Sequence, residues 1–392
     1  MIVAKNRPKI AFIVQRNGKE VNGGSETYCF LIAKLMIAVW DVEILTTCAL
    51  DYMTWENYYN EGVEIVDGVP IRRFKVDKPR DIEKFNEFSS KIFNKPNKMD
   101  LSDAEQWMKL QGPLSGDLLK YIEKEQQKYD AFVFFTYLYA TTYYGLQLVE
   151  KNKAFLVPTA HDEKPIYLPI WDDWFKKPQG FIINTIEERS FLKKRFPEVD
   201  FKGDIVGIGV DIPKVYSNIR FRQKYDIYAP YILYIGRIDE SKGCGQLFEY
   251  FIKFKEKNKI QLKLVVAGKP VMSIPNHKDI IHIGFIDDQT KFDAIEGCEF
   301  LINPSPFESL SIVLLEAWSL NKPVLVNAKS KVMVGQCTRS NGGLWYSNYY
   351  KYSKQVNYLL VNSYKFTNLK KFIEDNYSWE IIKNKYLRLL NV

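Results

Sequence analysis

The chain has 392 residues, of which 46% are hydrophobic, 26% charged and 15% aromatic. This composition excludes the intrinsically disordered class, and the length favours two hydrophobic cores over one. The 55 Lys and Arg residues exceed the 47 Asp and Glu residues by 55 − 47 = 8, without a long basic run. The excess fits anionic ligands, whereas the missing run argues against nucleic acid as a partner.

The cysteines and the apolar stretches indicate the cellular compartment of the protein. The five cysteines are scattered and form no Cys-x-x-Cys pair, so we expect reduced thiols and no metal site. Residues 1–8 contain no apolar core of signal-peptide length, and the longest apolar-aromatic stretch, residues 131–146, is shorter than the roughly 20 residues of a membrane helix. We therefore expect a cytoplasmic protein, and peripheral contact with an anionic surface at the inner face of a membrane stays open.

In the first half of the chain, short β-branched runs alternate with longer helical patterns, which is typical of repeated βαβ units and a parallel sheet. A strand at 9–14 leads into a glycine-bearing loop at 17–24 and a helix at 25–40. Residues 78–127 are expected to be largely helical. Further strands are expected at 42–47, in two short pieces within 63–76, and at 130–136, 154–159, 180–184 and 203–207.

A second cycle of the same pattern follows residues 211–230, which we interpret as a linker because they contain few periodic apolar residues. Helices are expected from about 241, near 289–295 and from about 309. Strands are expected at 231–235, 262–267, 280–283, 299–303 and 324–326.

The two cycles predict an α/β protein with two facing Rossmann-like, doubly wound domains and a cleft between them. The first domain is expected at 1–211 and the second at 212–376, with a C-terminal helix at 377–392 that packs back on the first domain. In doubly wound sheets, ligands bind at the carboxyl ends of the strands. We therefore expect the ligand in the cleft.

Two glutamates eight residues apart, Glu308 and Glu316, are the strongest candidate for a binding site. A Pro-rich loop separates a predicted strand end at Asn303 from a helix that starts near Ser309, and the free N–H groups of such a helix suit a diphosphate. Eight helical residues bring Glu316 back to within about 80° of Glu308. The apolar surroundings of Glu316 favour a partner such as a ribose diol. The spacing alone is equally compatible with two solvated charges.

A second candidate segment, Gly236-Arg237-Ile-Asp-Glu-Ser-Lys242-Gly243, directly follows a predicted strand. Arg237 offers a planar fork for phosphate and Lys242 a mobile point charge. Ser241 is a candidate cap for the helix that follows. An ordinary strand-to-helix turn with two solvated cations is the alternative, and the segment alone slightly favours it.

Three weaker features lie in the first half. Gly23 and Gly24 follow the first strand and allow a ligand to approach the backbone closely, with Ser25 as a candidate N-cap; a plain tight turn is the alternative. His161 ends a predicted strand, where an imidazole can exchange protons, although most histidines are structural. The aromatic-rich pieces 55–59 and 171–175 are interpreted as core, with contact to a sugar or a lipid as the alternative.

Together and in this order, the motifs resemble the retaining glycosyltransferases of the GT-B fold, in particular family 4, also called group 1. The resemblance covers almost the whole chain. It rests on Gly23-Gly24-Ser25-Glu26, His161, Gly236-Arg237 with Lys242-Gly243, the pair Glu308 and Glu316, and the terminal Ser378-Trp379-Glu380. Many relatives have Glu-Gly-Phe-Gly where this chain has Glu308-Ser-Leu-Ser311, a difference that removes some backbone freedom but is compatible with phosphate binding by backbone amides.

The resemblance implies roles for these residues. Arg237 and Lys242 would bind the donor diphosphate and stabilise the leaving group, Glu308 would hold sugar hydroxyls, and His161 would lie near the reacting centre. The catalytic candidates are therefore His161, Arg237, Lys242 and Glu308. The donor-binding candidates are Gly23, Gly24, Gly236, the amides of Ser309 and Leu310, and Glu316 at the ribose.

The resemblance also implies the reaction. The expected enzyme transfers a sugar, with retention, from a UDP- or GDP-linked donor to a saccharide or lipid-linked acceptor, as in bacterial cell-surface polysaccharide synthesis (class EC 2.4). It would need no metal and no other cofactor, because protein cations would neutralise the departing diphosphate. Another GT-B enzyme, such as a sugar-nucleotide epimerase or a phosphorylase, and a catalytically idle nucleotide-sugar-binding partner are the alternatives.

Overall fold

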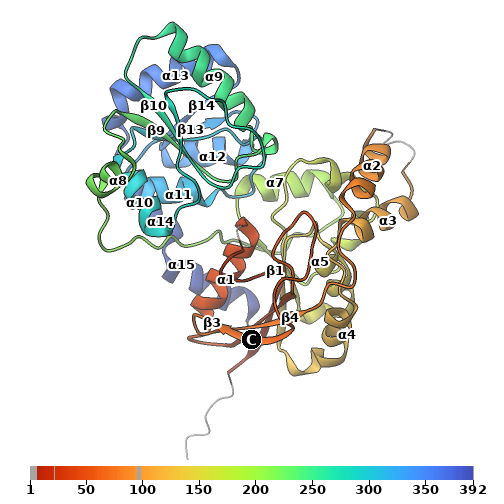
Figure 1. Ribbon diagram of the computed structural model, residues 1–392. Helices are drawn as coiled ribbons and strands as arrows, with labels where there is room; N and C mark the ends of the chain where they lie inside the picture. The colour runs from red at the N-terminus through yellow and green to blue at the C-terminus, as the bar shows by residue number, and fades with distance from the viewer. Residues whose placement is uncertain (1–6, 22, 95–98, 392) are drawn as a thin grey trace, which may run out of the picture. The chain divides into compact units, whose positions relative to one another are not determined.

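The computed structural model describes residues 7–21, 23–94 and 99–391. The chain separates into two compact units, Met1–Ile208 with Trp379–Val392 and Gly209–Ser378 (Figure 1). Asn22 of the predicted glycine-bearing loop, residues 95–98 of the predicted helical region, residues 1–6 and Val392 lie outside the described residues.

The first unit is built on an eight-stranded sheet. Its strands are β1 (Lys9–Arg16), β2 (Asp41–Thr47), β3 (Gly62–Val66), β4 (Val69–Phe74), β5 (Ala131–Phe135), β6 (Ala154–Val157), β7 (Gly180–Ile183) and β8 (Gly203–Ile205). Their order is β3-β4-β2-β1-β5-β6-β7-β8. Neighbouring strands pair in parallel, except for the antiparallel hairpin of β3 and β4. The predicted parallel sheet is therefore confirmed.

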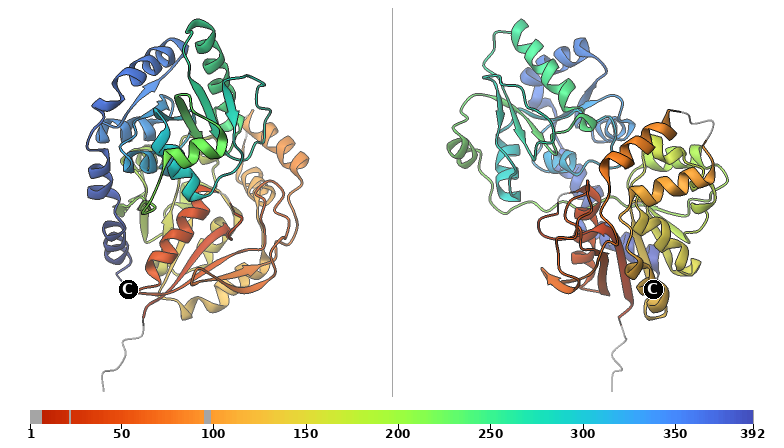
Figure 2. Two further views of the ribbon diagram at one scale, coloured as in Figure 1. Left: turned by 60° about the vertical axis from the view of Figure 1, so that its left-hand side comes forward. Right: turned by 45° about the vertical axis from the view of Figure 1, so that its right-hand side comes forward.

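Helices cover both faces of this sheet (Figure 2). They are α1 (Gly24–Met36), α2 (Ile82–Phe93), α3 (Leu101–Gln111), α4 (Gly116–Glu125), α5 (Ala140–Leu148), α6 (Trp171–Trp174), α7 (Ile186–Arg195) and α15 (Trp379–Leu390). Ala11 and Ile13 of β1 share a core with α3, α4 and α5, whereas Phe12 contacts Phe135, which in turn meets Tyr28 of α1. Strand side chains alternate between faces, so a continuous apolar run such as β1 supplies two cores.

Helix α15 belongs to the first unit although it follows the second in sequence. Its apolar stripe, Ile382, Tyr386 and Leu390, is buried. The Tyr386 hydroxyl lies 3.2 Å from the Tyr28 hydroxyl of α1, and Arg388 forms an ion pair with Asp204 of β8.

The second unit contains a six-stranded, wholly parallel sheet in the order β11-β10-β9-β12-β13-β14. Its strands are β9 (Tyr231–Ile235), β10 (Lys263–Ala267), β11 (Ile280–His282), β12 (Phe300–Asn303), β13 (Val324–Asn327) and β14 (Gly343–Tyr346). Its helices are α8 (Asn218–Tyr225), α9 (Cys244–Lys257), α10 (Asp288–Gly297), α11 (Ile312–Ser319), α12 (Lys331–Ser340), α13 (Tyr349–Asn362) and α14 (Leu369–Tyr377). The α/β class with two Rossmann-like units is thus confirmed.

Strand order reverses once in each sheet, between β1 and β5 and between β9 and β12. At such a switch point the loops at the carboxyl ends of the strands diverge and leave room for a ligand. The loops after β9 and β12 therefore mark the expected binding edge of the second unit, and the loops after β1 and β5 mark that of the first.

Three predicted boundaries are wrong. The predicted linker 211–230 contains the helix α8. This helix has no apolar stripe, because it buries only Phe221 and is held to α10 by a salt bridge between Arg220 and Asp293. The first helix ends at Met36 rather than residue 40. The helix expected from Ser309 begins at Ile312, because Ser311 adopts a left-handed conformation (φ 62°) that cannot continue a right-handed helix.

Candidate functional site

The predicted residues of the second unit lie on two neighbouring loops, after β9 and after β12. Gly236 follows β9 with φ 153°, a conformation that favours glycine. Gly243 has φ 75°, and a Cβ atom there would lie 2.4 Å from the carbonyl oxygen of Pro304. Only a glycine at position 243 therefore lets the two loops touch.

Lys242 and Glu308 meet across this contact. The Lys242 ammonium nitrogen lies 2.8 Å from Oε1 of Glu308, and both side chains are only partly exposed. Lys242 ends a short 3₁₀ helix, Glu240–Lys242, whose first turn is capped by Asp239. The prediction that Ser241 caps the following helix is wrong. The Ser241 amide donates to the Asp239 carboxylate at 2.7 Å, and α9 begins later, at Cys244.

Arg237 lies on the same loop as Lys242. Its Nε is 2.9 Å from Oδ2 of Asp239. Burial tends to raise the pKa of Asp239, but hydrogen bonds from Ser241 and the Arg237 guanidinium lower it overall. Asp239 therefore stays a carboxylate that both shapes the turn and orients Arg237.

The loop after β12 is held by buried amide side chains. Asn303 donates to the Ser311 hydroxyl at 3.0 Å and accepts from the Ser305 amide at 3.0 Å. Asn327 donates to the Pro304 carbonyl at 2.9 Å. Ser309 and Leu310 lie in this fixed turn before α11, so Glu308 and Glu316 do not share one helix, and the predicted angle of about 80° between them does not apply.

Glu316 has a partner in its own unit. Its Oε1 lies 2.5 Å from the Lys291 ammonium, which also lies 2.8 Å from Asp288. Burial alone would lower the pKa of Lys291, but the two carboxylates raise it overall. The expected need of this buried carboxylate for a partner is met by Lys291, and binding of a ribose stays a prediction.

In the first unit, Gly23 and Gly24 start α1. Gly23 is the extended N-cap residue, and a Cβ atom there would lie 2.1 Å from Oε2 of Glu26, whereas a Cβ atom on Gly24 meets nothing within 4 Å. Ser25 is not the cap that was expected, because it lies inside the helix and donates to Glu26 at 2.8 Å. Glu26 in turn forms a buried salt bridge with Arg16.

His161 follows β6 and lies beside an acidic residue that the sequence did not single out. Its Nε2 is 3.3 Å from Glu163, and Glu163 accepts a hydrogen bond from the Tyr137 hydroxyl at 2.8 Å. The turns that carry Tyr137 and His161 are joined by Thr136 and Thr159, whose hydroxyls are 2.8 Å apart. Both threonines have positive φ, 66° and 52°, which is rare for β-branched residues and clusters at functional sites.

Glu188 stabilises the turn after β6 that carries His161. Its fully buried carboxylate accepts the amides of Ala160 at 2.6 Å and Asn184 at 2.8 Å. Burial raises the pKa of Glu188 to about 7, although the hydrogen bonds from Asn184 and Ala160 oppose this rise. This role could not be predicted from the sequence, because a glutamate in the first turn of a helix is ordinarily exposed.

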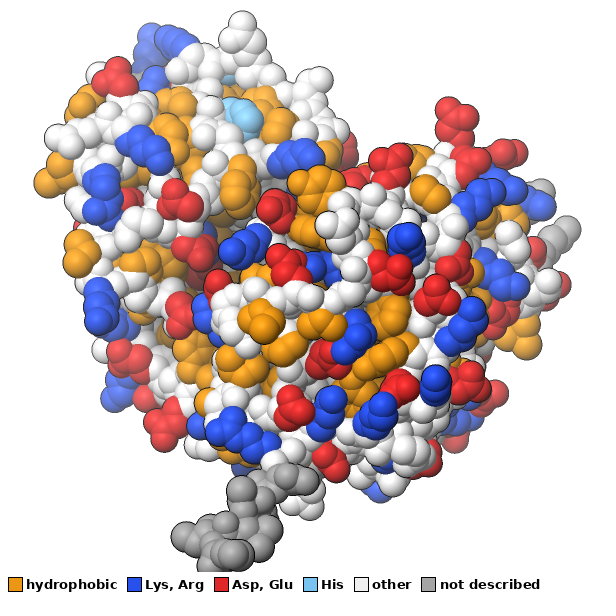
Figure 3. All heavy atoms as spheres, turned by 60° about the horizontal axis from the view of Figure 1, so that its bottom comes forward, with side chains coloured by type: hydrophobic (Ala, Val, Ile, Leu, Met, Phe, Trp, Pro, Cys, Tyr) orange, Lys and Arg blue, Asp and Glu red, His pale blue; other side chains and the backbone are white. Residues whose placement is uncertain are grey.

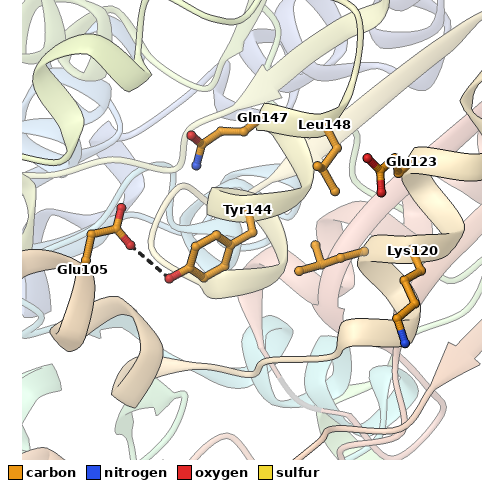
Figure 4. A pocket seen from close by; sticks show the side chains of 7 residues that line it. Glu105, Lys120, Glu123, Tyr144, Gln147 and Leu148 are labelled. Carbon is orange, nitrogen blue, oxygen red and sulfur yellow. Dashed lines mark hydrogen bonds between the residues drawn. The ribbon is translucent and has the colours of Figure 1, made fainter.

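Two pockets on the described part of the first unit contain none of the predicted catalytic or donor-binding residues, but Tyr58 and Tyr59 of the aromatic-rich piece 55–59 line the larger of the two. One, of about 340 Å³, lies between α3, α4 and α5, where Tyr144 points its hydroxyl at Glu105 (Figure 4). Glu105 also accepts from Tyr143, so its carboxylate is occupied. The other, of about 500 Å³, lies at the carboxyl edge of the sheet beside β3 and β4.

Within the described ranges, no group of three His, Cys, Asp or Glu side chains is placed to hold a metal ion. The helices described for this chain include none long and apolar enough to cross a bilayer. On the face drawn in Figure 3, Lys and Arg side chains are interspersed with Asp and Glu side chains.

Superposition on solved structures defines the fold as GT-B. Sucrose-phosphate synthase from Thermosynechococcus elongatus matches with a TM-score of 0.68 and 15% identity over 97% of this chain and 98% of that one. HepE from Anabaena, in complex with UDP-glucose, matches with a TM-score of 0.68 and 12% identity over 98% and 100%. WaaG, a glycosyltransferase involved in lipopolysaccharide biosynthesis, matches with a TM-score of 0.65 and 13% identity over 97% and 99%.

The sequence comparisons concern a smaller part of the chain. Residues 217–379 match the family model described as Glycosyl transferases group 1. The uncharacterized glycosyltransferase MJ1607 of Methanocaldococcus jannaschii is 25% identical over 176 residues, 41% of this chain and 44% of the relative. Granule-bound starch synthase 1 of Pisum sativum is 26% identical over 147 residues, 35% of this chain and 24% of the relative. The matches thus span less than half of either curated relative.

Proposed function

We propose that the protein is a retaining glycosyltransferase that moves a sugar from a nucleoside diphosphate sugar to a glycan or lipid-linked acceptor. The observation that carries this proposal is the Lys242–Glu308 pair, which joins the loops after β9 and β12 at the point where the strand order reverses. The match of residues 217–379 to group 1 glycosyl transferases supports it, because Arg237, Lys242, Glu308 and Glu316 all lie inside that stretch.

The proposed mechanism assigns the departing charge to protein groups. Arg237 and Lys242 provide two cations on one loop, and the N-terminal end of the α11 dipole adds a third source of positive potential. Together they neutralise the diphosphate as the bond to the anomeric carbon breaks. Glu308 then keeps one oxygen on Lys242 while the other accepts a sugar hydroxyl. No metal is required in this scheme.

The other residues hold the donor or lie near the reacting carbon. Glu316 accepts the ribose hydroxyls with one carboxylate oxygen while Lys291 holds the other. Gly24, with open space around its Cα, lets the donor approach the start of α1. His161 lies near the transferred sugar, held in place by Glu163.

We propose a UDP-linked sugar as the donor and cell-surface polysaccharide synthesis in the cytoplasm as the setting. HepE was solved with UDP-glucose and WaaG is involved in lipopolysaccharide biosynthesis, and both facts support these choices. The alternatives within this proposal are a GDP-linked donor and a protein attached peripherally to an anionic membrane.

The test is nucleotide release from a panel of UDP- and GDP-linked sugars, with and without saccharide acceptors and with EDTA. Release that needs an acceptor, persists in EDTA and gives a product with the donor's anomeric configuration by NMR is the expected result. Donor conversion without an acceptor would instead identify an epimerase. Binding of the donor without turnover would identify an idle binding protein, and either result would overturn the proposal.

A further inference from the structure

The pocket at the edge of the first sheet is lined by residues 58–64 and Arg73. Its volume of about 500 Å³ falls in the range of roughly 300–1,000 Å³ typical of small-molecule sites. Arg73 is the penultimate residue of β4, and Gly62, which pairs with it, begins the antiparallel β3. The pocket therefore lies at the carboxyl edge of the parallel strands, where doubly wound sheets bind ligands.

The floor of this pocket is rigidly held. The Tyr59 hydroxyl donates to Glu20 at 2.6 Å, and the Arg73 guanidinium lies 4.3 Å from the centre of the Tyr59 ring. A Cβ atom on Gly18 would lie 2.4 Å from the Tyr59 hydroxyl, so this glycine permits the loop after β1 to pack on Tyr59. A preformed site of this kind spends little free energy on ordering when it binds.

The Arg73 guanidinium is already used. Its Nε and Nη2 donate to the carbonyl oxygen of Asn17 at 3.3 and 3.1 Å, and its Nη1 forms a salt bridge with Glu64. The guanidinium is also buried, with 2% of the side chain exposed. Arg73 therefore stabilises the wall of the pocket and does not present its guanidinium to a phosphate or carboxylate ligand.

The remaining polar groups select an uncharged ligand. Glu61, Glu64 and Arg73 give the lining two carboxylates against one guanidinium, a net charge of −1. Lys75 lies 4.0 Å from Glu61, outside the lining, and both side chains are largely exposed. An anionic ligand would be repelled by this net negative charge, whereas hydroxyl groups find acceptors in the carboxylates and in the Asn60 amide.

Tyr58 supplies the apolar part of the site. Its side chain is 62% exposed although the neighbouring Trp55 is buried. Its ring meets that of Tyr59 edge to face, with centroids 5.0 Å apart. An exposed, held tyrosine ring beside hydrogen-bonding groups presents an apolar face and a polar rim together, which matches the alternating C–H and O–H groups of a sugar ring.

We propose that residues 58–64 with Arg73 form a binding site for a neutral saccharide. The interpretation of that saccharide as the acceptor rests on the proposed glycosyltransferase function, and it names the acceptor class as uncharged sugar rather than sugar phosphate or pyrophosphate-linked sugar. The binding site itself stands on the pocket, its charge and Tyr58.

The test is saturation-transfer difference NMR on the full chain, with maltose and lactose as neutral probes and glucose 6-phosphate as the charged probe. We expect at least one neutral disaccharide to bind and the phosphate to give no signal. Tyr58→Ala should raise the Kd about tenfold, equivalent to about 1.4 kcal/mol, and Glu61→Gln should raise it less. Tyr350→Ala, which removes another largely exposed tyrosine, from α13 of the other unit, is the matched control.

Each outcome has a consequence. The inference would be overturned if neither neutral probe gave a saturation-transfer signal, or if glucose 6-phosphate bound more strongly than the neutral probes. An unchanged Kd for the saccharide in Tyr58→Ala would overturn it as well. A thermal shift of the parent protein with UDP is measured in parallel. Saccharide binding without a UDP shift would leave this site in place and count against the proposed transferase, whereas a UDP shift without saccharide binding would do the reverse.

Discussion

The Lys242 ammonium lies 2.8 Å from a carboxylate oxygen of Glu308, although the two residues are 66 positions apart in sequence. Gly243 makes the contact possible, because its left-handed backbone lets the loop after β9 touch Pro304 in the loop after β12. Partly exposed ion pairs of this kind stabilise a fold by only about 0–1 kcal/mol. The pair therefore contributes little to stability, and the role that we propose for it is in donor binding.

The first prediction concerns Lys242→Ala. Removing one preorganised positive group from a developing charge costs about 10²–10³ in rate, so nucleotide release from the UDP-linked donor should fall by that factor. The free energy of unfolding should change by less than about 1 kcal/mol, because the lost pair is partly exposed. Both are measured against Lys351→Ala, an exposed cation on α13. A parent-like rate in Lys242→Ala would remove Lys242 from the mechanism.

A second prediction separates two roles of Glu316. In Glu316→Gln, the buried Lys291 keeps only the exposed Asp288 carboxylate, so the free energy of unfolding should fall by about 1–3 kcal/mol. The Kd for UDP should rise as well. Adding Lys291→Met removes the unpaired cation and should restore most of the stability without restoring UDP affinity.

Urea titrations and calorimetry of the single and double variants check this second prediction. If the double variant also recovered the parent Kd, Glu316 would act only as the partner of Lys291, and its assignment to the ribose would be wrong.

Much of the architecture could be predicted because many of the parallel strands, such as β5 and β9, are short, nearly continuous apolar runs. Tyr231–Ile235 is a strand with the bounds that its pattern predicts, and the hairpin within 63–76 follows from its Asp67-Gly68 turn. Helix α8 escaped prediction because most of its residues are polar or charged and only Phe221 is buried. Tertiary ion pairs, here Arg220 with Asp293, replace the apolar stripe that a sequence pattern detects.

The candidate site was predictable to a lesser degree. Residue type and order pointed to Lys242 and Glu308, but the direct contact between them depends on two loops meeting, which no local pattern encodes. The left-handed conformations of Thr136 and Thr159 contradict the preferences of their residue type, so sequence reasoning could not place them. Such local exceptions are expected where a fold is shaped by function.

A third prediction follows from the buried Glu188. Its pKa is raised to about 7 in the folded chain, above the ordinary value of 4.5, so the folded state binds the extra proton between these values. The stabilisation is complete below the unfolded pKa and is lost as the pH rises through about 7, a change of up to about 3 kcal/mol.

Glu188→Gln provides the control for this titration because glutamine has the same shape and does not ionise. The free energy of unfolding is measured by urea titration at several values between pH 5 and 8. The parent should lose stability over this range relative to the variant. Parallel curves for the two proteins would show that Glu188 titrates normally.

The last prediction compares two adjacent glycines. In Gly23→Ala the new methyl group meets the Glu26 carboxylate, which the buried Arg16 salt bridge and Ser25 hold in place, so the free energy of unfolding should fall by about 1–3 kcal/mol. In Gly24→Ala the methyl group meets open space, and alanine is the better helix former by up to about 1 kcal/mol, so stability should be kept or raised.

If the donor approaches the backbone at Gly24, the same methyl group obstructs it, and transfer should fall in a protein that is fully folded. Thermal unfolding and initial rates of both variants check the pair. A stable Gly24→Ala variant with the parent rate would show that the open space at Gly24 is not used by the donor.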